Sequence, residues 1–413
     1  MRIGPAGDVQ VTHGLITRGL DIRAADPWLD VRAGIAAMAP ALKAEISPQA
    51  PLGIYLRLSA FAARQLAQPS EMASFRDYLS SSGLYVFGVD TRGFGARRGR
   101  AVKEAAYRPD WTDPERLDYS DRAARIMAQL APSTRTGTVV TIPGLLAASN
   151  DAKAAEQVVF NLLRHVATLL GIERRTGCQV VLALNPEPGC LIETAGDTVR
   201  FFHQHLLGRD ALAYLAELCR IGVPMAAAVI RRHIGVSYDL CHGAVMFEDP
   251  LEALALLADA GIRVLELRLA AALRLPRVGP DARALLSPYE DGVRLRQVGE
   301  RHSGEIRHYL DLGPALKALD EGRAGGEWRV RCHVGPGSPD PIGMDAPAEA
   351  MRSVLAVLRE RAIAPNLVIE ADGWEYSESG PLPLSRAGIV VAAIRDMRWV
   401  LNELAATPRA ATG

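Results

Sequence analysis

The sequence predicts an α/β protein with a (β/α)8 TIM barrel, and three observations favour this fold. Eight short β-branched or apolar runs are spread along the 413 residues. Amphipathic stretches of helical length lie between them, and this alternation is typical of parallel sheets whose strands are joined by helices. Eight strands, each followed by a helix, fit a barrel better than an open doubly wound sheet. We therefore expect one barrel domain over residues 1–413.

The elements follow from the apolar runs and the helical patterns between them. The predicted barrel strands cover residues 10–15, 52–58, 84–89, 137–142, 179–184, 235–239, 263–269 and 367–371. The predicted helices cover residues 71–81, 118–130, 152–170, 194–205, 211–221, 251–260, 348–361 and 384–404. Consecutive β and α elements in this order predict parallel strands whose carboxyl ends meet on one face.

One segment departs from the repeat, between the seventh and eighth predicted strands. Residues 274–291 are rich in Pro, Gly and Arg, and the runs 293–298 and 305–312 read as a hairpin. A further apolar run, 328–334, follows. Since a typical barrel needs only about 250 residues, we expect an insertion over 274–340, with a hairpin and an extra strand near the catalytic face.

Charge and cysteine content exclude several classes of protein. The 47 basic and 47 acidic side chains cancel, so there is no global basic excess of the kind that nucleic-acid binding requires. The start of the sequence lacks a secretory h-region, and no apolar span reaches about 18 residues, which argues against membrane insertion. Five scattered cysteines form no Cys-x-x-Cys pair. A reduced, cytoplasmic location is the expectation.

Three carboxylates directly follow or end predicted strands, where a barrel places its active site. They are Glu187, Asp239 and Glu370, and His242 lies three residues after Asp239. Together they predict an oxygen-rich site for Mg²⁺, Mn²⁺ or a similar ion, with a carboxylate moving a proton. Any one of them could instead cap a helix or bond to a loop.

Arginines also gather at these strand ends. They are Arg57, Arg92, Arg97, Arg98 and Arg268. Guanidinium groups pair with phosphate or carboxylate, so an anionic substrate is one interpretation. The alternatives are a solvated loop for Arg97 and Arg98, and a buried ion pair with the nearby carboxylates for Arg57 and Arg268.

Four further residues are weighed for the site. His333 ends the run 328–334 and is either a metal ligand or substrate contact, or a core histidine. Trp374 could provide an apolar wall for a sugar or cyclitol ring. Cys190 and Cys241 neighbour site residues but lack the context of a nucleophile, so they are interpreted as packing residues.

Several segments resemble the metabolite traffic protein EboE family, which belongs to the xylose isomerase-like, sugar phosphate isomerase/epimerase-like TIM barrels. They include GLYVFGVD, the segment 107–111 (YRPDW), ALNPEPGC, GVSYDLCHGAVMFEDP and WRVRCHV. The resemblance covers about residue 50 to the end. It implies a cytoplasmic barrel that acts on a small hydroxylated metabolite.

This chain departs from the family pattern at several places, two of which bear on a metal site. Asn185 stands where the family has an acid, which is a metal ligand in the wider superfamily, and Arg268 stands where a Gln or His is usual. The resemblance and the positions of the residues together predict four metal ligands, which are Glu187, Asp239, Glu370 and His333. Two alternatives stay open: a divalent ion (Mn²⁺, Mg²⁺ or Zn²⁺) is bound, or it was lost with these substitutions.

The predicted function is a sugar- or cyclitol-type isomerase or epimerase that acts on a small polyhydroxylated, anionic metabolite. In this interpretation Glu187, Glu370 and His242 are catalytic. Arg57, Asn185, Arg268, His333 and Trp374 bind substrate. The alternative is a non-catalytic metabolite carrier on the same barrel. An abasic-site endonuclease, which also occurs on this superfamily's fold, is disfavoured by nine scattered histidines and zero net charge. The oligomeric state is left open.

Overall fold

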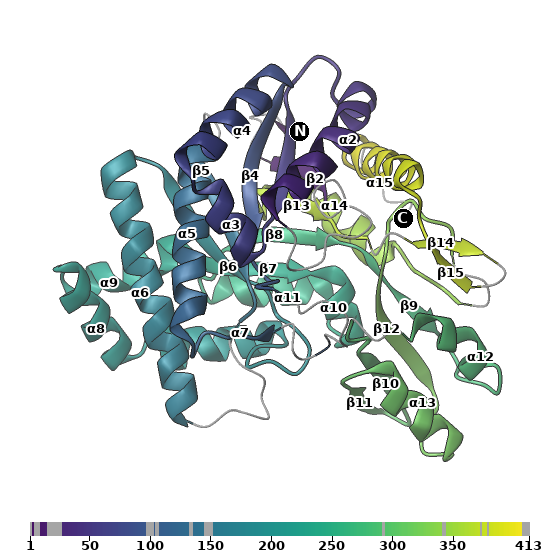
Figure 1. The fold of residues 1–413 in the computed structure, drawn as a ribbon. Coiled ribbons are helices and arrows are strands. Elements are labelled where there is room, and N and C mark those ends of the chain that lie inside the picture. Colours follow the sequence, from purple (N-terminus) through teal and green to yellow (C-terminus); the bar gives the residue numbers. More distant parts are fainter. Residues whose placement is uncertain are drawn as a thin grey trace.

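The computed structural model describes residues 2–3, 9–14, 27–95, 103, 107–131, 135–143, 152–290, 294–340, 344–371, 374–377 and 380–406. Residues 2–3, 374–377 and 380–383 are described by their backbone alone. Eight parallel strands form a nearly closed barrel with helices around it (Figure 1). These strands are β2 (Val9–His13), β3 (Leu52–Arg57), β4 (Leu84–Asp90), β5 (Thr136–Thr141), β6 (Gln179–Leu184), β7 (Ile234–Asp239), β8 (Val264–Leu269) and β13 (Asn366–Ile369). All eight predicted strands are confirmed, and the TIM-barrel prediction with them.

The sheet runs in the order β1-β2-β13-β8-β7-β6-β5-β4-β3, where β1 (Arg2–Ile3) pairs antiparallel with β2. In the described part of the chain, no backbone pairing joins β2 to β3. The two strands nevertheless lie together, because the Thr12 hydroxyl donates a 2.9 Å hydrogen bond to the carbonyl of Gly53. The two ends of the sheet therefore lie side by side, and the carboxyl ends of all eight strands face one mouth.

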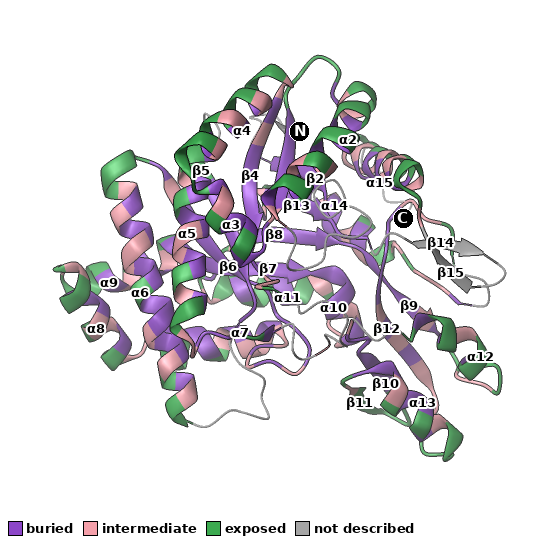
Figure 2. Ribbon diagram, in the orientation of Figure 1, coloured by how far each residue is buried: buried purple, intermediate pink, exposed green. Residues whose placement is uncertain are grey.

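Helices cover the outside of the barrel, with their exposed faces outward and their buried faces on the strands (Figure 2). They are α2 (Trp28–Ile46), α3 (Ala60–Leu66), α4 (Pro69–Ser81), α5 (Pro114–Leu130), α6 (Ala152–Thr176), α7 (Ala195–Phe201), a π-helical turn (Phe202–Leu206), α8 (Arg209–Cys219), α9 (Val223–His233), α10 (Leu240–Val245), α11 (Pro250–Asp259), α14 (Glu349–Glu360) and α15 (Arg386–Ala405). Several of these helices begin at residues that favour a helix start. Asp113 and Asp249 cap α5 and α11, each directly before a proline at the first helical position.

The interior of the barrel follows from the two-residue period of its strands. Tyr55, Phe87, Val140, Ala183 and Val368, which lie on five different strands, belong to one buried cluster, while their neighbours along the chain belong to the larger core cluster. One step further along β3 and β13, the same face carries a charge in place of an apolar group. The mouth of the barrel therefore begins directly above an apolar floor.

The insertion forms a second sheet of four antiparallel strands, β11-β10-β12-β9. These are β9 (Ala271–Leu275), β10 (Val298–His302), β11 (Glu305–Tyr309) and β12 (Glu327–Val334), accompanied by α12 (Ala282–Leu286), a 3₁₀ turn (Ser287–Tyr289) and α13 (Leu312–Asp320). The predicted hairpin and extra strand between barrel strands seven and eight are confirmed. A small hairpin, β14 (Trp374–Ser377) and β15 (Gly380–Pro383), follows β13.

The insertion differs from the prediction at two places. The sheet begins at Ala271, earlier than expected, because β9 follows β8 after one residue and its alanines gave no strand signal. The hairpin begins at Val298, later than expected, and the carbonyl of the preceding Gln297 accepts a hydrogen bond from the backbone N–H of Arg331 on β12.

No single helix in the described ranges has both the length and the apolar character of a membrane span. Only α8 and α9 taken as a pair meet that test, and they are bent by 93° at their junction.

Candidate active site

Register brings charged residues of neighbouring strands to the same level at the mouth. Arg57 is the direct partner of Asp90 across β3 and β4, and Asp239 is the direct partner of Arg268 across β7 and β8. Since parallel strands end on the same face, these four residues lie near the mouth, where their strands become loops.

Asp90, at the end of β4, binds two guanidinium groups. Its Oδ2 accepts hydrogen bonds from Nη2 of Arg57 at 2.8 Å and from Nη2 of Arg92 at 2.9 Å, and its Oδ1 accepts from the backbone N–H of Arg92 at 3.0 Å. Burial alone would raise the pKa of the Asp90 carboxyl, but Arg92, Arg57 and Arg268 outweigh it and hold the pKa well below its ordinary value. Asp90 is therefore an ionised anchor for these arginines. The sequence prediction missed it, although it is the first charged residue after the apolar run 84–89.

Glu370, just after β13, is held by the guanidinium of Arg268. Nη1 of Arg268 lies 2.5 Å from Oε2 of Glu370, while its Nε lies 2.8 Å from Oε1 of Glu266 and 3.2 Å from the hydroxyl of Ser237. Burial and the charge of Arg92 lower the pKa of Arg268, but Glu266, Glu370 and Asp90 outweigh them and raise it. A permanent cation therefore lies at the centre of the mouth.

Glu187 collects donors from both sheets. Its Oε1 accepts from the amide of Asn185 at 2.9 Å and from Nη1 of Arg92 at 3.4 Å. Its Oε2 accepts from Nη2 of Arg331 at 2.9 Å and from the hydroxyl of Tyr107 at 3.4 Å. Because Arg331 lies on β12, the insertion contributes a charged side chain to the barrel mouth. Neither Arg331 nor Glu266 was among the predicted site residues.

Solvent reaches these cations to different degrees. The Arg268 side chain is fully buried, whereas the side chain of Arg57 is 25% exposed and those of Arg92 and Arg331 are 12% and 11% exposed. Arg57 and Arg92 also share one acceptor, Oε1 of Glu370, at 3.2 and 3.4 Å. All three arginines that solvent reaches share a carboxylate partner with another arginine, since Arg92 and Arg331 both contact Glu187.

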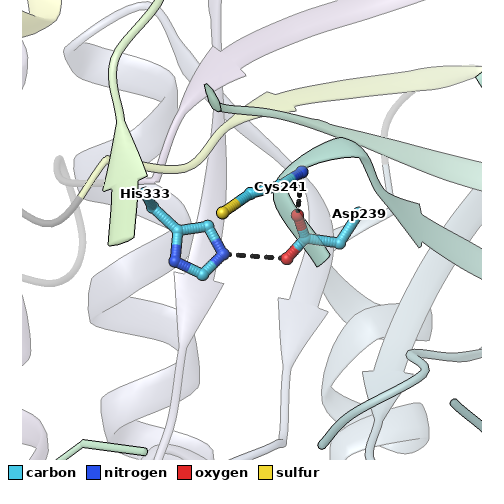
Figure 3. A group of neighbouring side chains, drawn as sticks. All are labelled: Asp239, Cys241 and His333. Atoms are coloured by element: carbon cyan, nitrogen blue, oxygen red, sulfur yellow. Dashed lines mark hydrogen bonds and ion pairs between the residues drawn. The ribbon is translucent and has the colours of Figure 1, made fainter. Parts of the chain in front are cut away.

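Asp239 belongs to a second group of residues in the mouth (Figure 3). Its Oδ2 lies 2.9 Å from Nε2 of His333, and its Oδ1 accepts from the backbone N–H groups of Cys241 and His242 as the N-cap of α10. Burial would raise the pKa of Asp239, but His333 and Arg331 outweigh it and lower the pKa. The structure thus brings His333 from the insertion against an ionised Asp239.

His242 is buried and turns one nitrogen toward the backbone. Its Nε2 lies 2.9 Å from the carbonyl oxygen of Glu193, so Nε2 carries the proton, since a carbonyl can only accept. Burial and the charge of Arg331 lower the pKa of His242 to about 4. At neutral pH its Nδ1 is therefore an unprotonated base, and it has no hydrogen-bond partner among the described residues.

The predicted site residues thus divide into two groups. Arg57, Asn185, Glu187, Arg268 and Glu370 lie in one network of hydrogen bonds and ion pairs, and Asp239 and His333 lie in the other. Trp374 begins β14, but its side chain lies outside the described residues, as do Arg97 and Arg98. The roles assigned to all of these residues stay predictions.

A divalent ion held by Glu187, Asp239, Glu370 and His333 is one of the two alternatives that the sequence leaves open, and the contacts of two of these residues do not fit it. Both oxygens of Glu187 and both of Glu370 accept hydrogen bonds from guanidinium, amide or phenol groups. An ion between these two carboxylates would lie among the guanidinium groups of Arg92 and Arg268. Donors that fit a metal lie in the other group, where atoms of Asp239, Cys241 and His333 are mutually within 4.8 Å.

No family model matches this sequence, and no curated protein matches it either. Similar solved structures include the IOLI protein with a binding zinc atom, which is 11% identical, covers 97% of this chain and 100% of its own, and has a TM-score of 0.48. The xylose isomerase domain protein from Planctomyces limnophilus is 12% identical, with 85% and 86% coverage and a TM-score of 0.42. L-ribulose 3-epimerase is 11% identical, with 96% and 94% coverage and a TM-score of 0.43. All three structures resemble this chain at low sequence identity.

Proposed function

We propose that the barrel mouth binds a small, polyhydroxylated, anionic metabolite and isomerises or epimerises it by carboxylate acid/base chemistry. One observation carries this proposal. Glu187 and Glu370 lie on either side of one guanidinium, because Nη1 and Nη2 of Arg92 reach their two Oε1 atoms at 3.4 Å each. Two carboxylates that contact the same guanidinium are close enough to act on neighbouring atoms of one small substrate.

Arg57 and Arg92 are the proposed contacts for the anionic group of the substrate. If Arg57 turns to the ligand, Asp90 keeps Arg92 as a partner and Glu370 keeps Arg268. No buried carboxylate then loses all of its cations, which is the costly outcome in such networks. Because the partners are shared, Arg57 can leave the carboxylates and bind the ligand at a low cost in free energy.

The proposed chemistry needs only groups already in the mouth. One of the two carboxylates removes the proton from the carbon next to the substrate carbonyl and becomes a carboxylic acid. The electron pair of the broken C–H bond moves to the carbonyl oxygen, where a guanidinium stabilises the negative charge. For the isomer, the hydroxyl group on the first carbon passes its proton to the former carbonyl oxygen, and the carboxylic acid returns its proton to the former carbonyl carbon, so that the carbonyl moves by one carbon. For the epimer, the other carboxyl group, in its acid form, delivers its proton to the opposite face of the first carbon, and the carbonyl is restored. Both steps conserve atoms and electrons, and no oxidant is needed.

A carrier is the second candidate function, and one observation favours it. Asn185 stands where the EboE-like pattern has an acid, which is a metal ligand in the wider superfamily, and Arg268 stands where a Gln or His is usual. Both side chains bind the carboxylates themselves. A protein that only holds its ligand can lose such chemistry and retain the pocket. We also propose that the protein belongs to the EboE family and is located in the cytoplasm.

A ligand screen followed by a turnover assay tests the proposal. The panel contains sugar phosphates, aldonates, and uncharged sugars and cyclitols of the same size, and the readout is the rise in melting temperature. We expect anionic polyols to stabilise the wild type, and R57M to lose the effect. The control is R64M, at an exposed position on α3. Stabilisation by neutral sugars alone, or an undiminished effect in R57M, would contradict the binding proposal.

A further inference from the structure

The second group in the mouth joins the barrel to the insertion. Asp239 ends β7 and Cys241 follows it in α10, whereas His333 lies on β12 of the small sheet. All three are buried, and one oxygen, the sulfur and one ring nitrogen lie within 4.8 Å of one another (Figure 3). Within the part of the chain that the structure describes, this is the one set of three or more such residues close enough to share a metal ion.

We propose that Asp239, Cys241 and His333 form a zinc site. Thiolate, imidazole and carboxylate are the three ligand types that Zn²⁺ takes in proteins. A thiolate ligand disfavours Mg²⁺ and Mn²⁺, which prefer oxygen. Three protein ligands leave a fourth position open, which is the arrangement found in catalytic zinc sites. Cys241, interpreted from the sequence as a packing residue, thereby acquires a chemical role.

The surroundings orient the carboxylate for this role. Oδ1 of Asp239 is fixed by the backbone N–H groups of Cys241 at 2.9 Å and His242 at 3.2 Å, and its Oδ2 faces Nε2 of His333. Supporting hydrogen bonds of this kind commonly hold a ligating carboxylate in place. A metal ion would replace the contact between Oδ2 and the imidazole, and the bonds to Oδ1 would persist.

The charge of the group also suits a dication. Arg331 is the nearby cation, and Glu187 neutralises it at 2.9 Å. Once Cys241 is a thiolate, the ligands carry two negative charges, which balance Zn²⁺. This site is separate from the carboxylates Glu187 and Glu370, which face guanidinium groups, so it goes beyond the proposed isomerase function and is testable without substrate.

Metal titration of the full-length protein tests the site. Protein stripped with a chelator is titrated with ZnSO₄, and bound metal is measured after gel filtration. Co²⁺ is used in parallel, because sulfur-to-cobalt charge transfer gives a near-ultraviolet band that reports a thiolate ligand. We expect one Zn²⁺ per chain and a rise in melting temperature with Zn²⁺. Mg²⁺ at the same concentration should have no effect.

Variants identify the ligands. C241S should abolish the cobalt band, and C190S, at another buried cysteine in the mouth, should retain it. D239N keeps an oxygen that can accept the two N–H bonds, and we expect it and H333Q to weaken zinc binding by at least roughly 100-fold, since losing even a supporting hydrogen bond costs 10–100-fold.

Two results would overturn the inference. The first is a wild-type protein that takes up no stoichiometric zinc and shows no cobalt band, which decides the matter even if C241S fails to fold. The second is a folded C241S that retains the band. Either result would leave the anion screen and the turnover assay of the proposed function untouched.

Discussion

Nη1 of Arg268 lies 2.5 Å from Oε2 of Glu370, and both side chains are buried, at 0% and 8% exposure. The positive charge at the centre of the barrel mouth is thus the guanidinium group of Arg268. Arg268 also contacts Glu266, which is fully buried. This network explains how four acidic side chains, Asp90, Glu187, Glu266 and Glu370, lie close together in the mouth without unpaired charge.

Removing the guanidinium of Arg268 should destabilise the protein strongly. R268M leaves Glu266 and Glu370 without their closest cation, and breaking a buried pair in this way costs about 3–5 kcal/mol. Urea unfolding measures the loss of free energy. The control R263M, at an exposed position one residue before β8, should change it by less than about 0.5 kcal/mol. Equal stabilities of R268M and wild type would show that the buried ion pair is not formed.

Neutralising either carboxylate beside Arg92 should separate turnover from binding. E187Q and E370Q retain the size of the side chain and an oxygen that accepts hydrogen bonds, but they lose the base. We expect the turnover number to fall by roughly 10²–10⁴-fold, with ligand affinity changed far less. Calorimetry and a rate assay measure the two quantities. E156Q, at an exposed position on α6, is the control. Full turnover in both variants would show that neither Glu187 nor Glu370 is the catalytic base.

The depressed pKa of Asp90 predicts a specific pH dependence of stability. Its folded-state pKa lies well below the unfolded value of about 3.9. The unfolded chain therefore binds the proton first, so the stabilisation is complete above about pH 5 and is lost as the pH falls toward the folded pKa.

D90N should flatten the stability curve in that window. It also lowers stability at pH 7, because it removes the shared partner of Arg57 and Arg92. D118N, at an exposed position on α5, should follow the wild-type curve. The measurement is the free energy of unfolding from pH 7 to pH 3. An identical acid slope in D90N and wild type would contradict the ionised network.

Gly88 should be required for close packing of the apolar floor beneath the mouth. A Cβ at this position on β4 would lie 2.0 Å from Cε2 of Tyr55 on β3, so the ring must move. We expect G88A to cost about 1–3 kcal/mol through overpacking. G34A, inside α2 with open space around it, should stabilise the protein by up to about 1 kcal/mol. Thermal unfolding of both variants checks the contrast, and a neutral G88A would show that the barrel floor is loosely packed.

The barrel was predictable because its strands are buried on both faces, which gives continuous apolar runs such as 179–184. The helix α2 escaped prediction, since Pro40 interrupts an otherwise regular apolar face. In the insertion, β9 escaped because alanine carries little strand signal.

Prediction of the site was limited by register. The rule that polar residues ending apolar runs line the mouth identifies Glu370 and Asp239, and applied to the run 84–89 it would also have found Asp90. Glu266 and Arg331 lie inside strands, and nothing local distinguishes them from surface charges. Their partners depend on which strands lie side by side, which only the folded chain defines.

Deuterium incorporation from D₂O tests the central claim most directly. An anionic polyol that raises the melting temperature is incubated with the protein in D₂O, and ¹H NMR follows the proton on the carbon next to the carbonyl. The account predicts that this signal disappears with wild type and persists with E187Q or E370Q. A ligand that binds tightly to the wild type and never exchanges that proton would contradict carboxylate acid/base catalysis and leave the carrier function.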